Sequence, residues 1–513
     1  MSTIRRVDAS SGREPLFGVA ATRRIEAQGL RDAPAFTLMT RAGDAVARLA
    51  LALAPHAERV LILAGPGNNG GDGLEAATRL RALGKDASVV LLGDPAALPA
   101  DAGQAHARAR QAGVPVSPWP PASHDAPDLV IDALLGIGAS RPPAGNLAAA
   151  IALVARHAAR GVPVLAVDVP SGLDPERGQP LGEACVVAEH TLALIGARPG
   201  LFTASGRDFA GTVWTDALGL DLAPQTPDAW LVGTGEIARH GTPRRHAEHK
   251  GSFGDVAIVG GAAGMTGAAL LAARAAHAAG AGRVFVDLLD ADVPALALDP
   301  ERPELMLRPR WCQGPAAAVE MSTVVCGCGG GDAVRAALPR LVGLASRLVL
   351  DADALNALAV DTALRTVLAA RASRDRATIL TPHPLEAARL LGTTTQAVQA
   401  DRLGSATALA DRYRATVVLK GSGSVIATPG EAPRICATGN ASLATGGTGD
   451  VLAGWIGGLW AQTSAHETPE RDAYEVAVRA VAEHGAAAGP PQVGPTRAAD
   501  LVEALHARLA RAS

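Results

Sequence analysis

The chain is poor in aromatic residues and has no large excess of charge of either sign. Aromatic residues make up 3% of its 513 residues, and the formal net charge is −3. A nucleic-acid-binding surface normally carries a basic excess, so nucleic acid is not an expected partner. Hydrophobic residues reach 48%, and with so few aromatic rings the cores must be built largely from Leu, Val, Ile and Ala.

Cysteines are few, and long apolar runs are absent from the sequence. Five cysteines, an odd number, are scattered along the chain, which does not indicate a disulfide framework. Cys326 and Cys328 are too close for the usual zinc spacing, so we expect reduced structural thiols. No apolar segment follows Arg5 and Arg6 as in a secretory leader, and none reaches the roughly 18 apolar residues of a membrane span. We therefore expect a cytoplasmic protein with no membrane partner.

The length exceeds what one hydrophobic core usually organises, which favours two domains. In both halves, short apolar runs alternate with Ala-rich helical stretches, and this pattern predicts parallel sheets with helices on their faces. We predict strands at residues 59–64, 88–92, 129–133, 164–167, 256–259, 284–288, 323–326, 348–350, 378–380 and 417–419.

Apolar helices are predicted at residues 267–279, 473–488 and 498–510. The pattern of the last two fits either a core or a contact between subunits. We expect the protein to be a homo-oligomer.

A stretch rich in proline, glycine and charge separates the two halves at residues 221–250. We place the boundary there, giving domains 1–225 and 226–513. Three histidines in this stretch could bind a metal ion, but the neighbouring basic residues would repel a cation and favour a solvated linker. These histidines are His240, His246 and His249.

A glycine-rich turn at residues 65–73 follows the first strand of the N-terminal half. Between a strand and a helix, its backbone N–H groups would favour a phosphate or pyrophosphate. The turn satisfies Gly-x-Gly-x-x-Gly, but Asp94 lies about thirty residues further on, against the roughly twenty of a dinucleotide-binding dehydrogenase. A hydride-transferring dehydrogenase is therefore disfavoured.

Three polar residues, Asp132, Asp168 and Ser171, stand at or just after the predicted ends of two further strands. The carboxyl ends of parallel strands line the ligand crevice of an open sheet. Oxygen ligands converging there would suit a hard cation. Equally, the two aspartates could only cap the turns that follow them.

These segments closely resemble the NAD(P)H-hydrate epimerase domain over roughly residues 20–220. The resemblance implies a Rossmann-like three-layer α/β/α domain, a potassium ion held by Asn69, Asp132 and Ser171, and Asp168 as the acid/base group at C6 of the hydrated nicotinamide ring. It implies that the hydrated dinucleotide contacts Asp168 and two loops, whose residues are Asn68, Asn69, Gly70, Gly71 and Asp72, and Gly136, Ile137, Gly138, Ala139, Ser140, Arg141 and Pro142.

A second glycine-rich turn, at residues 446–449, opens an apolar helix in the C-terminal half. Its N–H groups would form an anion hole. Asp450 cannot itself bind a phosphate, so beside an anion hole it indicates a catalytic base or an acceptor for a substrate hydroxyl. A capping role is the less favoured alternative.

The turn resembles the signature of ribokinase-like kinases. Together with residues 251–255, 259–268, 351–357, 380–386 and 418–424, it resembles NAD(P)H-hydrate dehydratase over about residues 240–510. The family implies a ribokinase-like α/β domain that phosphorylates the ring hydroxyl from ADP, releases AMP, and eliminates phosphate to restore NADH or NADPH. Mg²⁺ is expected for phosphoryl transfer.

The resemblance also implies which residues bind the two substrates. The adenine nucleotide would contact Lys420, Gly421, Ser422, Gly423, Ser424 and Gly449. The hydrate would contact Ala268, Gly331, His383 and Asp450, although His383 between two prolines would by itself fit a surface turn. The chain departs from the family at Cys328, where a proline is typical.

The favoured hypothesis is a fused repair enzyme whose substrates are NADH hydrate, NADPH hydrate and ADP. Its N-terminal domain would interconvert the R and S epimers, and its C-terminal domain would dehydrate the S epimer. One alternative is a ribokinase-like kinase for a small molecule such as a vitamin precursor, with an appended α/β domain. Another makes the N-terminal half a non-catalytic nucleotide-binding or docking module.

Overall fold

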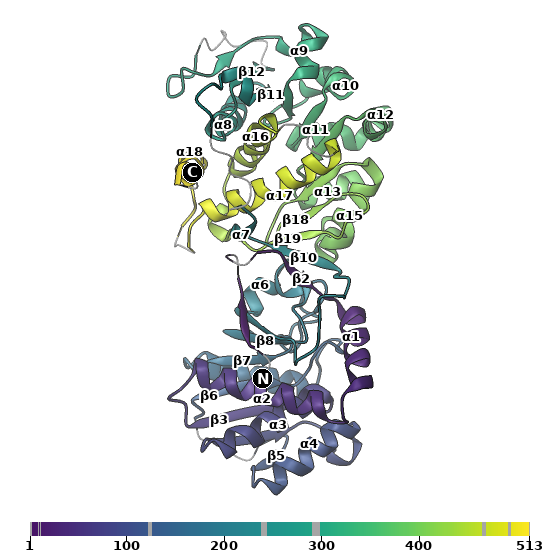
Figure 1. The fold of residues 1–513 in the computed structure, drawn as a ribbon, viewed down its shortest axis with the longest axis vertical. Coiled ribbons are helices and arrows are strands. Elements are labelled where there is room, and N and C mark those ends of the chain that lie inside the picture. Colours follow the sequence, from purple (N-terminus) through teal and green to yellow (C-terminus); the bar gives the residue numbers. More distant parts are fainter. Residues whose placement is uncertain are drawn as a thin grey trace. The chain divides into compact units, whose positions relative to one another are not determined.

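The structure is a computed structural model that describes residues 3–8, 10, 12–121, 126–237, 244–289, 298–463, 468–490 and 494–511 (Figure 1). The chain divides into two compact units. Unit 1 comprises Met1–Asp8 and Glu14–Trp230, and unit 2 comprises Ala9–Arg13 and Leu231–Ser513. In the described part of the chain, no helix is both long and apolar enough to cross a membrane.

Unit 1 contains a sheet with the strand order β1-β9-β8-β7-β6-β3-β4-β5, in which only the β1–β9 pair is antiparallel. The order reverses between β3 and β6, the position where open α/β sheets bind ligands. The strands are β1 (Arg5–Val7), β3 (Arg59–Ala64), β4 (Asp86–Leu91), β5 (Val116–Pro118), β6 (Leu129–Ala133), β7 (Val164–Val167), β8 (His190–Leu194) and β9 (Thr212–Asp216).

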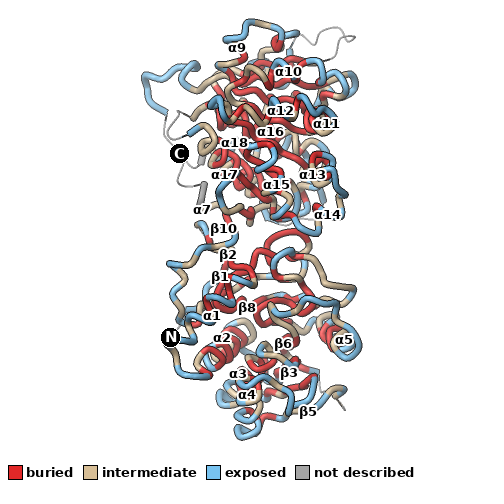
Figure 2. Tube along the Cα trace, turned by 90° about the vertical axis from the view of Figure 1, so that its right-hand side faces the viewer, coloured by how far each residue is buried: buried red, intermediate tan, exposed pale blue. Residues whose placement is uncertain are grey.

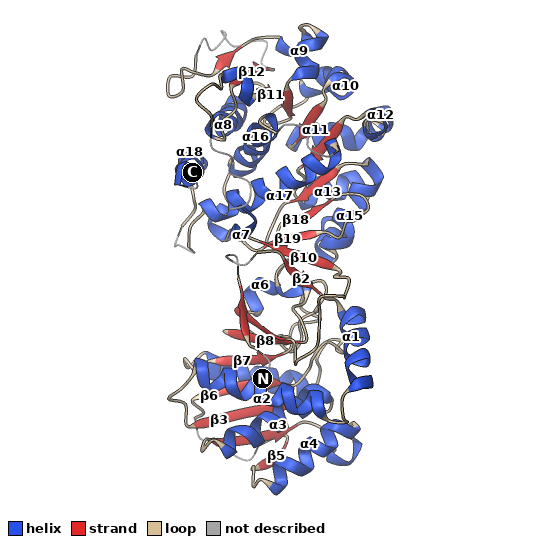
Figure 3. Ribbon diagram, viewed as in Figure 1, coloured by secondary structure: helices blue, strands red, loops and turns tan. Residues whose placement is uncertain are grey.

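Helices cover both faces of this sheet (Figure 3). Side chains alternate along β3, so that Val60 and Ile62 pack with α2 and α3, whereas Leu61 and Leu63 pack with α5. Unit 1 therefore has the three-layer α/β/α arrangement that the sequence predicts. Its helices are α1 (Val19–Asp32), α2 (Thr37–Leu53), α3 (Asn68–Ala82), α4 (Ala100–Gln111), α5 (Asn146–Ala158) and α6 (Gly206–Phe209).

Unit 2 contains a larger sheet with the order β13-β12-β11-β14-β15-β16-β17-β18-β19, parallel up to β17 and antiparallel beyond it. The strands are β11 (Asp255–Gly260), β12 (Arg283–Leu288), β13 (Met306–Leu307), β14 (Thr323–Cys326), β15 (Arg347–Leu350), β16 (Ala377–Leu380), β17 (Thr416–Leu419), β18 (Val425–Ala427) and β19 (Arg434–Cys436). The short elements β2 (Glu14–Leu16), β10 (Ala229–Val232) and α7 (Thr234–Ile237) lie beside the unit boundaries in the chain.

One layer of unit 2 contains α8 (Thr266–Ala278), α16 (Thr448–Ala461), α17 (Pro469–Ala487) and α18 (Ala498–Arg511), and their apolar residues form one core cluster. Buried residues are concentrated in the interior of each unit (Figure 2). The opposite layer contains α9 (Ala316–Met321), α10 (Val334–Leu344), α11 (Ala352–Val360), α12 (Thr362–Ala369), α13 (Pro384–Leu391), α14 (Thr395–Ala400) and α15 (Arg402–Tyr413).

The helices α17 and α18 use their apolar faces inside unit 2. Tyr474 on α17 and Leu501 and Leu505 on α18 are each at most 1% exposed. The apolar pattern of these helices is therefore explained by the core, and the expected homo-oligomer stays a prediction.

Glycines let α16 pack very closely against α8. A Cβ atom added to Gly454 would lie 1.9 Å from the carbonyl oxygen of Ala272, and one added to Gly458 would lie 2.4 Å from that of Ala276. Trp455 on the same helix is buried, and its indole N–H donates to Glu483 Oε2 at 2.7 Å. These contacts fix the helix whose first turn carries Asp450.

We predict that Gly454→Ala destabilises the protein by about 1–3 kcal/mol, because the added methyl group cannot fit without moving a packed backbone. Denaturant unfolding of the full chain measures this change. Gly343→Ala, in α10, is the matched control because a Cβ there meets open space, and it should be neutral or slightly stabilising. Equal unfolding midpoints for the two variants would contradict the packing argument.

Candidate active sites

The first candidate site lies at the carboxyl ends of β3, β6, β7 and β8, which are neighbours in the sheet of unit 1. The loops after β3 and β6 touch at the reversal of strand order. A Cβ atom on Gly65 would lie 1.8 Å from the carbonyl oxygen of Leu134, so only glycine permits this contact. The glycine-rich turn therefore lies directly against the loop after β6, at the position where open α/β sheets bind ligands.

The glycine-rich turn leads into the start of α3. Gly67 precedes the helix in an extended conformation, and no side chain among the described residues caps the first helical turn. A Cβ on Gly70 would lie 2.0 Å from the carbonyl oxygen of Gly65, so the turn folds tightly on itself. Uncapped N–H groups at a helix start suit a phosphate group.

Asp132 and Ser171 form a buried hydrogen-bonded pair at the ends of β6 and β7. Asp132 Oδ1 accepts from Ser171 Oγ at 2.6 Å and from Leu134 N at 3.2 Å, and Oδ2 accepts from Ser171 N at 2.8 Å. Both side chains are fully buried, and burial raises the pKa of Asp132 to about 6. Asp132 thus caps the turn that follows it and also joins two strand ends.

The surroundings of Asp132 fit a monovalent cation. Among the described residues, no Lys or Arg pairs with this buried carboxylate. The side-chain Nδ2 of Asn69 is buried and has no hydrogen-bond partner within the described chain, and its Oδ1 would lie 3.1 Å from a Cβ on Gly136. Since amide N and O positions are assignments, a reversed amide would turn an oxygen to the unpartnered position. Carboxylate, hydroxyl and amide oxygens are the donors that a hard cation prefers.

Asp168 follows β7 and has a positive φ of 67°, which a non-glycine residue rarely adopts. Its Oδ1 accepts from Arg198 Nη2 at 2.8 Å, and its Oδ2 accepts from Ile137 N at 3.3 Å. Asp168 therefore contacts the 136–142 loop predicted to bind substrate. Gly138, Ser140, Arg141 and Pro142 of that loop are exposed.

Two more carboxyl groups share the electrostatic field of Asp168. Burial raises the pKa of Asp72 well above its ordinary value, and the charge of Asp168 raises it further. The pKa of Glu26 on α1 is raised in the same way, first by burial and then by Asp168. The site thus combines one ion-paired carboxylate with two carboxyl groups that take up protons more easily.

The second candidate site lies at the carboxyl ends of β14, β15, β16 and β17, beside the first turn of α16. Asp351, directly after β15, is 2% exposed, and its Oδ1 accepts from Lys420 Nζ at 2.6 Å and from Thr381 Oγ1 at 2.8 Å. Burial lowers the pKa of Lys420, but Asp351 and Glu386 outweigh this and raise it overall. Residues after three neighbouring strands are therefore joined by one buried carboxylate.

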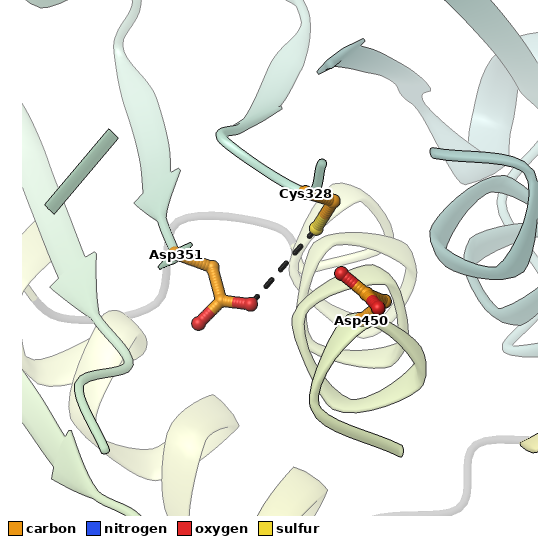
Figure 4. A group of neighbouring side chains, drawn as sticks. All are labelled: Cys328, Asp351 and Asp450. Carbon is orange, nitrogen blue, oxygen red and sulfur yellow. Dashed lines mark hydrogen bonds between the residues drawn. The ribbon is translucent and has the colours of Figure 1, made fainter. Parts of the chain in front are cut away.

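Cys328, Asp351 and Asp450 point toward one another from two strand ends and the start of α16 (Figure 4). Their ligand atoms all lie within 4.8 Å of one another. Burial raises the pKa of Asp450 to about 6, and the charge of Asp351 contributes in the same direction. Burial, Asp450 and Asp351 raise the pKa of Cys328 well above its usual range, so its thiol stays protonated.

The start of α16 offers backbone N–H groups beside a cation. Gly447 precedes the helix with a φ of 92°, and no side chain caps the first turn. A Cβ on Gly449 would lie 3.4 Å from Lys420 Nζ, so the ammonium group lies against this turn. An uncapped helix start and an ammonium group together suit a phosphate chain.

Residues 421–424 form the hairpin between β17 and β18, with Gly421 and Gly423 at positive φ. The buried Arg402 supports the hairpin, because its Nη2 donates to the carbonyl oxygens of Leu419 and Lys420 at 3.1 and 3.2 Å. The start of the predicted nucleotide-binding segment is therefore anchored by hydrogen bonds from Arg402.

The loop after β14 lies against the first turn of α8. A Cβ on Gly329 would lie 2.9 Å from Cβ of Ala268, and Gly331 N donates to Asp353 Oδ2 at 2.8 Å.

A cavity of about 220 Å³ is lined by Gly331, Asp332, Arg335, Asp353, Asn356 and Ala357. A larger cavity of about 350 Å³ lies at the amino ends of β16 and β17 and contains none of the predicted site residues.

The position of His383 is compatible with both interpretations made from the sequence, a residue of a surface turn and a contact for the hydrate. Its Nδ1 accepts from Leu385 N at 3.1 Å and caps α13, while its Nε2 lies 3.2 Å from Glu386 Oε1. Burial and Lys420 lower the pKa of His383, so the ring is neutral at pH 7. The side chain is still 45% exposed, which leaves it accessible to a ligand.

The histidine stretch between the domains shows a local structural role. His249 Nδ1 accepts from Gly251 N at 3.1 Å, so this ring caps a short helical turn. His246 is exposed, and His240 lies outside the described residues.

The sequence interpretation did not assign a site role to several residues that the structure brings into the sites, four of which matter most. Arg198 pairs with Asp168, Asp351 joins the second site, Cys328 faces Asp450, and Glu386 is buried beside His383. Asp351 and Glu386 fall within segments that carry the family resemblance, which was the available signal. All five cysteines are free, and Cys328 lies in a site rather than only in a core.

The fold and the geometry together define an α/β protein with one candidate active site in each unit. Comparison with known sequences agrees. The protein-family model described as NAD(P)H-hydrate dehydratase matches residues 256–504, and the family model described as YjeF-related protein N-terminus matches residues 35–200.

Two curated relatives match most of the chain. The bifunctional NAD(P)H-hydrate repair enzyme Nnr of Escherichia coli is 36% identical, with 88% of this chain and 84% of that protein covered. The enzyme of the same name from Coxiella burnetii is 37% identical, with 83% and 86% covered. The chain belongs to the family of bifunctional NAD(P)H-hydrate repair enzymes, which confirms the resemblance identified from the sequence.

A solved structure also aligns with part of the chain. The ADP/ATP-dependent NAD(P)H-hydrate dehydratase of Bacillus subtilis, crystallised with ATP and Mg²⁺, is 27% identical and covers 55% of this chain and 98% of its own, with a TM-score of 0.43.

Proposed function

We propose that unit 1 interconverts the R and S epimers of hydrated NADH and NADPH, and that unit 2 dehydrates the S epimer at the expense of ADP. The observation that carries this proposal is that Asp168 in unit 1 contacts the 136–142 loop, whereas Asp450 in unit 2 lies beside Asp351, the partner of Lys420. Asp168 acts electrostatically on Asp72 near the start of α3, and Asp450 lies in the first turn of α16. Both helix starts suit the phosphates of a nucleotide.

In unit 1, the amides at residues 68–72 would bind the pyrophosphate, and the 136–142 loop would enclose the nicotinamide end. Asp168 Oδ2 faces that loop and would exchange a proton with the C6 hydroxyl as it leaves and as water returns to the opposite face of the ring. Asn69, Asp132 and Ser171 would hold K⁺, which supplies positive charge beside the buried carboxylate.

In unit 2, Lys420 and the amides at Gly449 would hold the phosphates of ADP, with Gly421, Ser422, Gly423 and Ser424 along the nucleotide. Asp450 would remove the proton of the ring hydroxyl as its oxygen attacks the terminal phosphorus and AMP leaves. The C–O bond then breaks with loss of phosphate and of a proton from the neighbouring carbon, which restores the ring double bond. Ala268, Gly331 and His383 would contact the hydrate.

The carboxylates of Asp351 and Asp450 are oxygen donors that suit Mg²⁺, whereas the thiol of Cys328 does not. When bound there, Mg²⁺ would neutralise charge on the transferred phosphoryl group. Lys420 already shares Asp351, so the ammonium group and the metal ion would act on the same phosphate chain.

A small-molecule kinase is the second candidate for unit 2, because a base at an anion hole is equally suited to a stable phosphoryl transfer. Incubation of the protein with ATP or ADP and candidate alcohols distinguishes the two functions. A kinase accumulates a phosphorylated product, whereas a dehydratase given the hydrate yields NADH absorbance and free phosphate.

We predict opposite losses of activity for two variants. Asp168→Ala should lose epimerisation by about 100-fold or more and retain dehydration of the S epimer, and Asp450→Asn should show the reverse, because each removes one acid/base group. Both activities are measured on hydrate prepared from NADH, by resolving the epimers and by following NADH absorbance.

The activity that each variant retains shows that its unmutated unit is folded. Full epimerisation by Asp168→Ala would instead support a unit 1 that only binds nucleotides or docks a partner. Full dehydration by Asp450→Asn would exclude this residue as the base.

We predict that dehydration falls as the pH drops through about 6, because Asp450 must be ionised to accept a proton and its pKa is about 6. Asp351→Asn should move this acidic limb to lower pH, since the variant removes a negative charge that raises the pKa of Asp450. Profiles of kcat/KM against pH measure both effects. An acidic limb that stays in place in Asp351→Asn would contradict the assignment.

We predict that K⁺ stabilises the protein against thermal unfolding more than Li⁺ at equal ionic strength. A tenfold excess over the dissociation constant corresponds to about 1.4 kcal/mol. Asp132→Asn and Ser171→Ala should each reduce the difference between the two salts. An unchanged K⁺ effect in both variants would place the ion elsewhere.

A further inference from the structure

Arg198 is the most deeply buried cation of the first site. It follows β8 and is 1% exposed, although arginine is almost never fully buried unless paired. Its Nη2 donates to Asp168 Oδ1 at 2.8 Å and to the carbonyl oxygen of Leu194 at 2.9 Å, and its Nη1 donates to the carbonyl oxygen of Gly196. The guanidinium group is thus anchored by the backbone of its own turn as well as by the carboxylate.

This anchoring gives the two oxygens of Asp168 different tasks. Oδ1 is held by Arg198 and by Leu194 N at 3.4 Å. Oδ2 accepts only the longer bond from Ile137 N, at 3.3 Å, among the bonds described for it. The oxygen that faces the 136–142 loop is therefore the one free to exchange a proton with a ligand.

Strained backbone conformations mark both ends of this interaction. Asp168 has a φ of 67° and Ile195, three residues before Arg198, has a φ of 70°. A non-glycine residue in this region is strained and persists where surrounding contacts hold it. The ion pair and the carbonyl contacts of Arg198 supply such contacts on both turns.

The other charged groups that face Asp168 are mostly acidic. Glu26 of α1 and Asp72 of α3 both respond to its charge, and Asp101 of α4 acts on both of them. Arg23 of α1 offsets part of the charge on Glu26. In the described chain, Arg198 is the cation that forms an ion pair with Asp168.

We propose that Arg198 is a positioning residue for epimerisation, which holds Oδ1 of Asp168 and thereby turns its Oδ2 toward the substrate loop. This inference rests on the proposed role of Asp168. Without Arg198, the side chain of Asp168 could rotate out of its strained turn, and Oδ2 would no longer face the loop. Proton exchange between Asp168 and the C6 hydroxyl would then slow.

The test compares Arg198→Met and Arg198→Lys in the full chain, with kcat and KM for epimerisation measured separately. In Arg198→Met, kcat should fall at least about tenfold while KM changes by less than about twofold, because the turn proposed to bind the pyrophosphate is untouched. Arg198→Lys keeps a charged donor for Oδ1 but cannot bridge the carboxylate and two carbonyl groups. It should restore only part of the lost kcat.

Arg108→Met is the matched control, because Arg108 pairs at 2.9 Å with Glu75, a buried carboxylate of the same unit. It should lower thermal stability and leave kcat for epimerisation unchanged. Thermal unfolding reports the folding of unit 1 in every variant, and dehydration reports that of unit 2. If Arg198→Met does not fold, a reduced kcat at an unchanged KM in Arg198→Lys decides.

A normal kcat in Arg198→Met, a rise in KM that accounts for its whole loss of kcat/KM, or an equal loss of kcat in Arg108→Met would overturn the inference. Failure of the proposed function looks different, because Asp168→Ala would then epimerise at the normal rate. Loss of activity in Asp168→Ala with a normal kcat in Arg198→Met would reject the role of Arg198 alone.

Discussion

Negative charge buried at the ends of parallel strands is the constraint on which both sites depend. Taking a carboxylate out of water is costly unless it is paired or hydrogen-bonded. Asp351 is compensated by Lys420 and Asp168 by Arg198, whereas within the described chain Asp132 has hydrogen-bond donors from Ser171 and Leu134 and no cationic side chain. Two of these carboxylates thus have a cation supplied by the protein, and the proposed K⁺ would take that place at the third.

The glycine-rich turns contribute to the charge balance of the sites through backbone groups. A helix start carries partial positive charge, and a side chain that capped it would compete with a ligand. Among the described residues, no side chain caps α3 or α16, and glycine precedes each helix. The positive ends of both helices are therefore open to an anionic ligand, as the proposed function requires.

Much of the fold could be predicted from the sequence, because strands buried on both faces read as continuous apolar runs. The strands β3, β6, β7 and β14 have the predicted limits. Strands such as β8, which begins with His190 and Thr191, and β18, only three residues long, lack that signal. They are defined by their neighbours in the sheet, which a local pattern does not contain.

The sites could be predicted only in part, for a related reason. Glycine-rich turns and strand-end aspartates are local patterns, so Asn69, Asp132 and Asp450 could be singled out. Arg198 lies thirty residues beyond Asp168, in a turn with no motif of its own, and meets it only because β7 and β8 are adjacent. In the sequence, Cys328 was notable only as a departure from the family, and its position beside Asp450 is visible only in the structure.

Every described residue assigned to the first site belongs to unit 1, and every one assigned to the second belongs to unit 2. Because one polypeptide carries both, the two catalysts are always made in a ratio of one to one. Synthesis of the chain therefore cannot raise the capacity to dehydrate the S epimer without raising equally the capacity to replenish it from the R epimer. The balance between the two steps is set by the kinetic constants of the sites, and it can shift in evolution through residues such as Arg198 or Asp351 without any change in expression.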